Sequence, residues 1–192
     1  MRLLFRQICE AGNIVLANLL FVHYKHIIDT KHAVERAFRK TCTKGHLDVA
    51  KWLLKIRPDL NISANHYFAF FESCVNGHLK MAKWIFNILT SKGKYLNKEY
   101  KTCLQTAEWI DDTFSLACAY NKMNVAKWML IKFPNIDVSY NNHFGFSKAC
   151  QNGNLTMVVW LIDIQSSYKF VKDRQTKKLV PYFEGNILPH RF

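Results

Sequence analysis

Residues 37–54 read AFRKTCTKGHLDVAKWLL, and this stretch decides the fold because four other stretches align with it without a gap. The four are LFRQICEAGNIVLANLLF from Leu4, AFFESCVNGHLKMAKWIF from Ala69, TFSLACAYNKMNVAKWML from Thr113 and GFSKACQNGNLTMVVWLI from Gly145. The five starts are 33, 32, 44 and 32 residues apart. Three of the four intervals agree to within one residue, and a period in this range is typical of stacked repeats. One structural unit is therefore expected to recur five times, with twelve extra residues before the fourth block.

The first half of each block predicts a short helix. Its second position is always Phe and its sixth is always Cys, at Phe5, Phe38, Phe70, Phe114 and Phe146 and at Cys9, Cys42, Cys74, Cys118 and Cys150. Residues four apart share a helix face, so both columns are expected to face the core. Three residues after the Cys comes Gly12, Gly45, Gly77, Asn121 or Gly153. Gly and Asn accept the left-handed backbone that ends a helix, so the first helix is expected to end there.

The second half of each block predicts a second helix. Its apolar positions in the second block are Leu47, Val49, Ala50, Trp52, Leu53 and Leu54. The tryptophan recurs as Trp84, Trp128 and Trp160, whereas Leu19 takes its place in the first block. We expect each tryptophan to be buried against neighbouring helices. The fold class predicted from these patterns is all-α, a helical solenoid of about five stacked helix-turn-helix repeats.

Composition is consistent with one continuous array. The chain has 192 residues, of which 49% are hydrophobic, and only seven glycines and four prolines. Its net charge of +13 would attract nucleic acid, acidic protein surfaces or anionic lipid. That charge is divided, because residues 37–66 and 166–192 each carry +4. Residues 1–165 are expected to form the array, and 166–192 a basic C-terminal tail or cap.

The sequence does not favour a membrane protein or a secreted one. The longest apolar candidate, Ile14 to Val22, is interrupted by Asn18 and is far shorter than the roughly 18 residues that a membrane span needs. Arg6, Gln7 and Glu10 disrupt the pattern of a secretory signal. We expect an intracellular monomer, in the cytoplasm or nucleus.

One stretch carries a family resemblance. The run from Gly45 to Leu54, closed by Asp59-Leu60-Asn61, resembles the glycine-histidine, double-valine, triple-leucine and Asp-x-Asn signature of ankyrin repeats. Asn135-Ile136-Asp137 repeats the last element. The cysteine-bearing first helix and the Ala-Lys-Trp-Leu-Leu second helix are most similar to the ankyrin arrays of giant DNA viruses of amoebae. The resemblance covers residues 4–165 and departs at the first-helix start, where Arg36-Ala37-Phe38-Arg39 replaces the threonine-proline-leucine-histidine element.

The resemblance implies a module that binds a partner protein, including a host protein, through its concave face. In ankyrin proteins, the segment before each first helix lines that face, and here it corresponds to Asn61 to Phe68 and Asp137 to Phe144. The partner-binding candidates are Asn65, His66, Tyr67, Asn141, Asn142 and His143. The alternative is that Asn and His only satisfy the turn backbone.

Two patterns suggest metal or disulfide chemistry but have simpler interpretations. Five of the six cysteines occupy one column, and stacked helices lie about 8–10 Å apart, too far for equivalent cysteines to pair. Cys42 with His46, and Cys74 with His78, have the spacing of two metal ligands, but a glycine interrupts each pair. We expect core cysteines, histidines that bond the inter-helix turn, no metal and no cofactor.

Catalysis is not predicted. The close acids are Glu108, Asp111 and Asp112, and the two aspartates suit the start of a helix. No phosphate-binding loop or nucleophile motif appears in the sequence. The chain is therefore expected not to be an enzyme, with no catalytic residues.

The alternative function is nucleic-acid binding. Lys51, Lys83 and Lys127 precede three of the tryptophans and would form a basic column able to follow a phosphate backbone. Lysine also simply favours helices and covers apolar surface with its stem. Protein binding is the preferred interpretation.

The insertion, about residues 91–112, has two interpretations. It is either an exposed loop, in which Tyr95 and Tyr100 offer aromatic contact surface, or a degenerate repeat in which Leu104, Ala107 and Ile110 pack as part of a helix. The sequence leaves both open.

Overall fold

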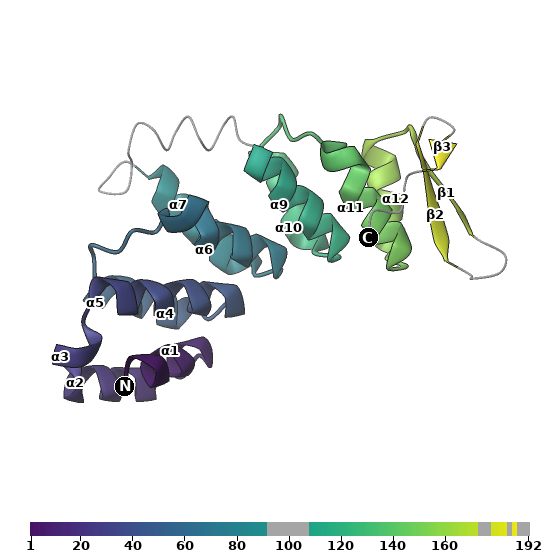
Figure 1. The fold of residues 1–192 in the computed structure, drawn as a ribbon. Coiled ribbons are helices and arrows are strands. Elements are labelled where there is room, and N and C mark those ends of the chain that lie inside the picture. The colour runs from purple at the N-terminus through teal and green to yellow at the C-terminus, as the bar shows by residue number, and fades with distance from the viewer. Residues whose placement is uncertain (92–107, 173–177, 184–185, 188–192) are drawn as a thin grey trace. The chain divides into compact units, whose positions relative to one another are not determined.

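The computed structural model of the chain describes residues 1–91, 108–172, 178–183 and 186–187. These residues are mostly helical, which confirms the expected predominance of α-helix (Figure 1). The chain divides into two compact units, Met1–Thr102 and Cys103–Phe192. Residues 92–107, which hold most of the expected insertion with Tyr95, Tyr100 and Cys103, lie outside the described part. Residues 108–112, the end of that insertion, belong to a helix.

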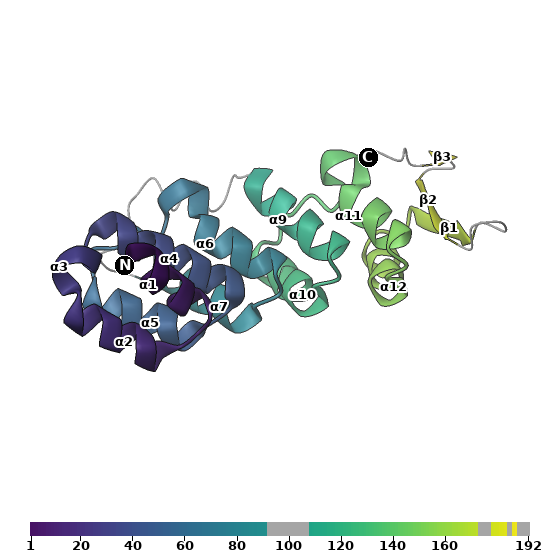
Figure 2. The same cartoon turned by 60° about the horizontal axis from the view of Figure 1, so that its bottom comes forward.

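The first unit is built of helix pairs. Its helices are α1 (Arg2–Glu10), α2 (Ile14–His23), α3 (Lys25–Ile28), α4 (Lys31–Lys44), α5 (Leu47–Ile56), α6 (Ala64–Val75) and α7 (Leu79–Thr90). The first helices of successive blocks pack side by side, with α4 against both α1 and α6 (Figure 2). Each of these three also packs against the helix that follows its turn.

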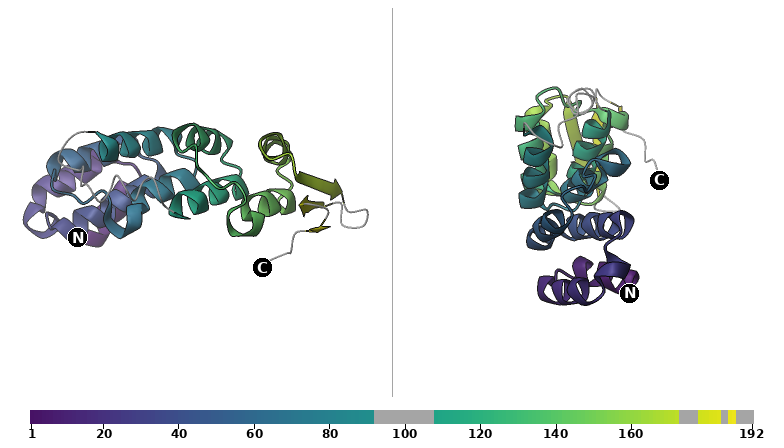
Figure 3. Two further views of the ribbon diagram at one scale, coloured as in Figure 1. Left: turned by 90° about the horizontal axis from the view of Figure 1, so that it is seen from above. Right: turned by 90° about the vertical axis from the view of Figure 1, so that its left-hand side faces the viewer.

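The second unit repeats the pairing and adds a small sheet. Its helices are α9 (Glu108–Ala119), α10 (Met123–Lys132), α11 (Tyr140–Gln151) and α12 (Leu155–Ile164). Its strands are β1 (Tyr168–Lys172), β2 (Leu179–Phe183) and β3 (Asn186–Ile187), antiparallel in that order, with Phe170 opposite Pro181. The strands lie beside α11 and α12 (Figure 3). Sequence reasoning gave this segment no strands.

The predicted core columns are confirmed. All five phenylalanines of the second position are at most 2% exposed, and the five cysteines of the sixth position are fully buried. The cysteines are free thiols, as their spacing predicted. Burial raises the pKa of the Cys9 and Cys150 thiols to about 12, so these side chains stay protonated and unreactive near neutral pH.

The helix ends are also confirmed. The φ angles are 77° at Gly12, 78° at Gly45, 84° at Gly77, 59° at Asn121 and 69° at Gly153. All five positions are left-handed, and Asn121 substitutes for glycine as the sequence predicted. The turn between the paired helices is therefore the same in every block.

The tryptophan prediction was wrong for three of the four residues. Only Trp128 is buried, at 7% exposure, while Trp52, Trp84 and Trp160 are half-buried. The residue after each tryptophan is at most 1% exposed, namely Leu53, Ile85, Met129 and Leu161. The rings instead reach across to the phenylalanine of the preceding block, with centroid distances of 6.2 Å for Phe5–Trp52, 6.3 Å for Phe38–Trp84 and 6.3 Å for Phe114–Trp160. Each of these three rings therefore packs between two neighbouring blocks and stays partly exposed to solvent.

Candidate binding surface

Two turns with the same design lead into α6 and α11. In the first, Asn61 Oδ1 accepts hydrogen bonds from the amide of Ser63 at 3.1 Å and from its hydroxyl at 2.7 Å. In the second, Asp137 Oδ1 accepts from the amide of Ser139 at 2.9 Å and from its hydroxyl at 2.5 Å. An Asn or Asp side chain that bonds the backbone two residues later holds a tight turn. The two turns that precede α6 and α11 are therefore held by the same pair of hydrogen bonds.

Both turns continue into left-handed backbone, which lies within the bounds of α6 and α11 and interrupts α11 after its first residue. Tyr67 has φ 59°, and its amide donates to Ser63 O at 3.1 Å. Asn141, Asn142 and His143 have φ of 53°, 54° and 60°, and the His143 amide donates to Ser139 O at 2.8 Å. The left-handed conformation costs a residue other than glycine roughly 1–2 kcal/mol, with asparagine among the most tolerant. Three such residues in succession mark a strained segment, and strained segments concentrate at binding sites.

The candidate residues differ in their accessibility. Asn141 and Asn142 are exposed. His143 is half-buried, with Nδ1 3.1 Å from the Tyr168 hydroxyl and its ring edge-on to that of Tyr168 at 5.4 Å. Tyr67 is only 6% exposed, so it lies inside the fold rather than on the surface. The side chains of Asn65 and His66, like Tyr95 and Tyr100, lie outside the described part of the structure.

Tyr168, the first residue of β1, packs against the Asn141–His143 turn. Its ring stacks on Phe146 at 4.2 Å with an interplanar angle of 15°. Its hydroxyl donates to Val138 O at 3.1 Å. Burial raises the pKa of that hydroxyl, and the charge of Asp137 raises it further. The hydroxyl therefore stays protonated and can donate. Phe146 thus meets Tyr168, whereas Phe5, Phe38 and Phe114 each meet a tryptophan. The sequence columns did not predict this contact.

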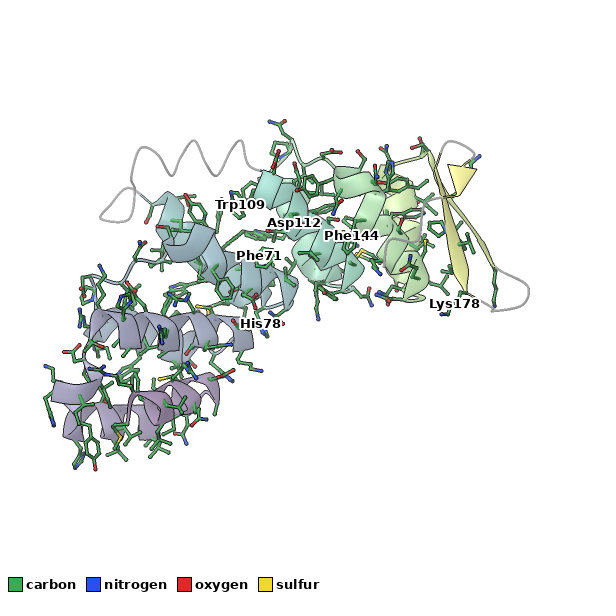
Figure 4. The ribbon with its side chains drawn as sticks, viewed as in Figure 1. Phe71, His78, Trp109, Asp112, Phe144 and Lys178 are labelled. Carbon is green, nitrogen blue, oxygen red and sulfur yellow. The ribbon has the colours of Figure 1, made fainter. Side chains whose placement is uncertain are left out.

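Acidic side chains lie next to this turn. The Asp111 carboxylate accepts from the Asp137 amide at 2.9 Å, so the start of α9 supports the start of the next block. Desolvation raises the pKa of the Asp111 and Asp112 carboxyls. Desolvation and then the charges of Asp112, Glu108 and Asp111 raise the pKa of Tyr140. Figure 4 shows Asp112 on α9 and Phe144 on α11, and the Lys148 ammonium lies 6.0 Å from the centre of the Phe144 ring.

The histidines of the second and third blocks contact the preceding block. His78 Nε2 is 2.9 Å from Thr43 O, and the ring lies against Gly45. The His46 ring lies against Gly12 in the same way. His78 thus bonds the last turn of α4 in the preceding block, rather than the inter-helix turn of its own block as expected. Within the described ranges, no group of three or more His, Cys, Asp or Glu side chains could hold a metal ion.

An arginine that sequence reasoning missed joins the first and second blocks. Arg57 Nη1 donates to the Asp29 carboxylate at 2.8 Å and to the Asp29 carbonyl at 3.1 Å. Its Nε and Nη2 donate to Asp59 at 2.9 and 2.8 Å. These bonds lower the pKa of the Asp59 carboxyl below its ordinary value. In the sequence, the spacing of Arg57 two residues before Asp59 is the signal that could have indicated this ion pair.

The lysines of the basic column are all exposed. Lys51 and Lys83 belong to the first unit, and Lys127 to the second. The Lys127 ammonium lies 5.9 Å from the centre of the Trp160 ring.

Comparison of the chain with known protein families and with curated proteins gives no match. Among the described residues, no helix combines the length and the apolar character needed to cross a membrane. The class of protein that the fold and this surface define is a mostly helical protein of paired helices, whose most distinctive surface feature is a polar, left-handed turn.

Proposed function

We propose that this chain is an ankyrin-type repeat protein that binds a partner protein through the turns before its first helices. Support comes from the shared period of the five blocks and from the contacts that recur between neighbours. Phe–Trp and Gly–His contacts each join one block to the next at equivalent positions. A repeat array of this kind offers an extended surface for another macromolecule. We infer an intracellular partner, a host protein included, because the buried free thiols suit a reducing compartment.

The observation that carries the proposal is the conformation of Asn141, Asn142 and His143. Three consecutive left-handed residues include two whose amide side chains are exposed on the surface. An amide group both donates and accepts hydrogen bonds, and a rigid turn loses little conformational entropy when a partner binds. The neighbouring carboxylates of Glu108 and Asp112 favour a partner surface that presents hydrogen-bond donors or cationic side chains.

The alternative, nucleic-acid binding, rests on the exposure of Lys51, Lys83 and Lys127. Such binding would weaken steeply as salt rises, because each neutralised phosphate releases counterions. Salt dependence therefore separates the two functions.

The experiment compares what the full chain and two variants retain from a cell lysate at physiological salt. Asn141→Gly with Asn142→Gly removes both amides while glycine keeps the left-handed backbone accessible. Asn135→Gly is the matched control, since Asn135 is an exposed asparagine outside the turn. We expect one protein to be retained by the wild-type chain and by Asn135→Gly but lost by the double variant.

Two outcomes would contradict the proposal. Equal retention by all three chains would show that the turn does not contact the partner. Tight nucleic-acid binding at physiological salt, lost when Lys51, Lys83 and Lys127 are changed to Glu, would favour the alternative function.

A further inference from the structure

A cavity of about 390 Å³ lies between α1 and the start of α4, and three arginines line it. Arg2 and Arg6 are one turn apart on α1, and Arg36 lies near the start of α4. Thr30, His32 and Ala33 complete the wall that α4 contributes. None of these residues belongs to the turn at Asn141–His143, which lies in the other unit.

The arginines of this cavity lack acidic partners among the described residues. The nearby acids pair elsewhere: Glu35 lies 3.8 Å from His32, and Asp29 bonds Arg57. Arg2 Nε donates to a backbone carbonyl, that of Ile27, at 2.7 Å. Arg6 Nε is buried and has no hydrogen-bond partner in the described part of the chain. Three guanidinium groups without carboxylate partners give the cavity the positive charge to receive an anion.

The first residues of α4 also line this cavity, and two of their neighbouring amides are already bonded to Thr30. Thr30 Oγ1 accepts from the Ala33 amide at 3.3 Å, and Thr30 O accepts from the Val34 amide at 3.1 Å. The amides of Lys31 and His32 have no acceptor within the helix, since the first amides of any helix lack one. This helix has 14 residues, so its N-terminus carries partial positive charge that favours an anion.

We propose that this cavity binds a small molecule through a phosphate monoester group. A monoester carries nearly two negative charges at neutral pH and three terminal oxygens, which match the planar donor groups of several arginines. A phosphodiester has one charge, and both its ends must leave the site. The cavity volume falls within the range of small-molecule sites, so an organic group beside the phosphate is accommodated.

The test is calorimetric titration of the full chain with three probes: inorganic phosphate, phosphoserine and a dinucleotide phosphodiester. We expect saturable binding, tightest for phosphoserine. Arg6→Gln and Arg36→Gln should each weaken phosphoserine binding roughly tenfold or more, which is the effect of losing one hydrogen bond to a charged group. Arg39→Gln is the matched control, because it removes the same charge from α4 outside the cavity lining.

Circular dichroism melting checks that each variant folds. Arg36 is exposed, so Arg36→Gln keeps the test valid even if Arg6→Gln unfolds. Absence of saturable phosphoserine binding at millimolar concentration would overturn the proposal, as would an equal loss in Arg39→Gln. If inorganic phosphate bound as tightly as phosphoserine, the organic part of the ligand would add nothing, and the proposal of a phosphate monoester would be wrong. A preference for the dinucleotide would point instead to nucleic acid on this basic surface.

Discussion

The imidazole of His78 lies against the α-carbon of Gly45 in the preceding block, with its Nε2 2.9 Å from Thr43 O. A methyl group at Gly45 would overlap that ring. Gly153 has the same left-handed backbone, but nothing lies within 4 Å of the site that its methyl group would occupy. Glycine is therefore needed at Gly45 for two reasons and at Gly153 for one.

The first prediction compares alanine at these two glycines. Gly153→Ala should lower the free energy of unfolding by about 1–2 kcal/mol through left-handed strain alone. Gly45→Ala should lower it by about 2–5 kcal/mol, since displacing the His78 ring adds an overpacking cost of about 1–3 kcal/mol. Urea denaturation monitored by circular dichroism measures both. Equal losses would mean that the His78 ring does not occupy this position.

The second prediction concerns three consecutive residues of α7. Ile85 is fully buried, so Ile85→Ala should cost about 2–5 kcal/mol. Trp84 is half-buried against Phe38, so Trp84→Ala should cost less, about 1–3 kcal/mol. Lys83 is exposed, and Lys83→Ala should change stability by less than about 0.5 kcal/mol. A larger loss at Trp84 than at Ile85 in urea denaturation would restore the tryptophan as the core residue.

The third prediction is a pH dependence of stability from Asp59. Its lowered pKa, caused by Arg57, keeps the folded carboxylate charged where the unfolded chain binds a proton. The resulting stabilisation is present above the ordinary carboxyl pKa of about 3.9 and is lost as the pH falls through the depressed value. Asp59→Asn should therefore lower the Tm at neutral pH and flatten its decline below about pH 4.

Thermal melting between about pH 2.5 and pH 7 tests this expectation. Asp163→Asn on α12 is the control, since Asp163 is an exposed acid for which no ion pair is described. An acid decline equally steep in Asp59→Asn and in the wild-type chain would contradict the coupling to Arg57.

The fourth prediction concerns the contact between the sheet and the last helix pair. Tyr168→Ala removes a buried ring that stacks on Phe146 and should cost about 3–5 kcal/mol. Tyr168→Phe keeps the stack but loses the bond to Val138 O, and should cost about 1–2 kcal/mol. Urea denaturation gives both values, and NMR of the His143 ring should report the lost hydroxyl. If alanine were tolerated as well as phenylalanine, β1 would not stabilise this helix pair.

The fifth prediction tests the left-handed turn itself. Asn142→Gly should leave stability unchanged or raise it by up to about 1 kcal/mol, because glycine adopts positive φ without strain. Asn142→Val should destabilise by more than about 1 kcal/mol, because a β-branched residue is strongly disfavoured there. Thermal melting distinguishes the two. Valine that is tolerated as well as glycine would show that Asn142 is not left-handed.

The sequence by itself determined the features that depend on spacing and local backbone. The four-residue interval from Phe to Cys was enough to predict both core columns, because residues at that interval share a helix face. Gly and Asn predicted the left-handed helix ends, Asn121 included, because few other residues accept positive φ. Of the two aspartates expected at a helix start, Asp111 lies in the first turn of α9 and Asp112 follows it. Asn141 and Asn142 were identified as candidates only through the family resemblance.

Only the tertiary structure decided what depends on residues distant in the chain. Burial of Ile85 rather than Trp84 follows from the packing of neighbouring helices, and a periodic pattern gives the same weight to both. The strand at Tyr168 and its stack on Phe146 join residues 22 apart that share no repeat position. The convergence of Arg2, Arg6 and Arg36 requires α1 to pack on α4, so no motif along the chain contains it. Helix faces and turn conformations depend on residues a few positions apart, so the sequence predicts them. Burial and the assembly of a site depend on which residues distant in the chain pack together.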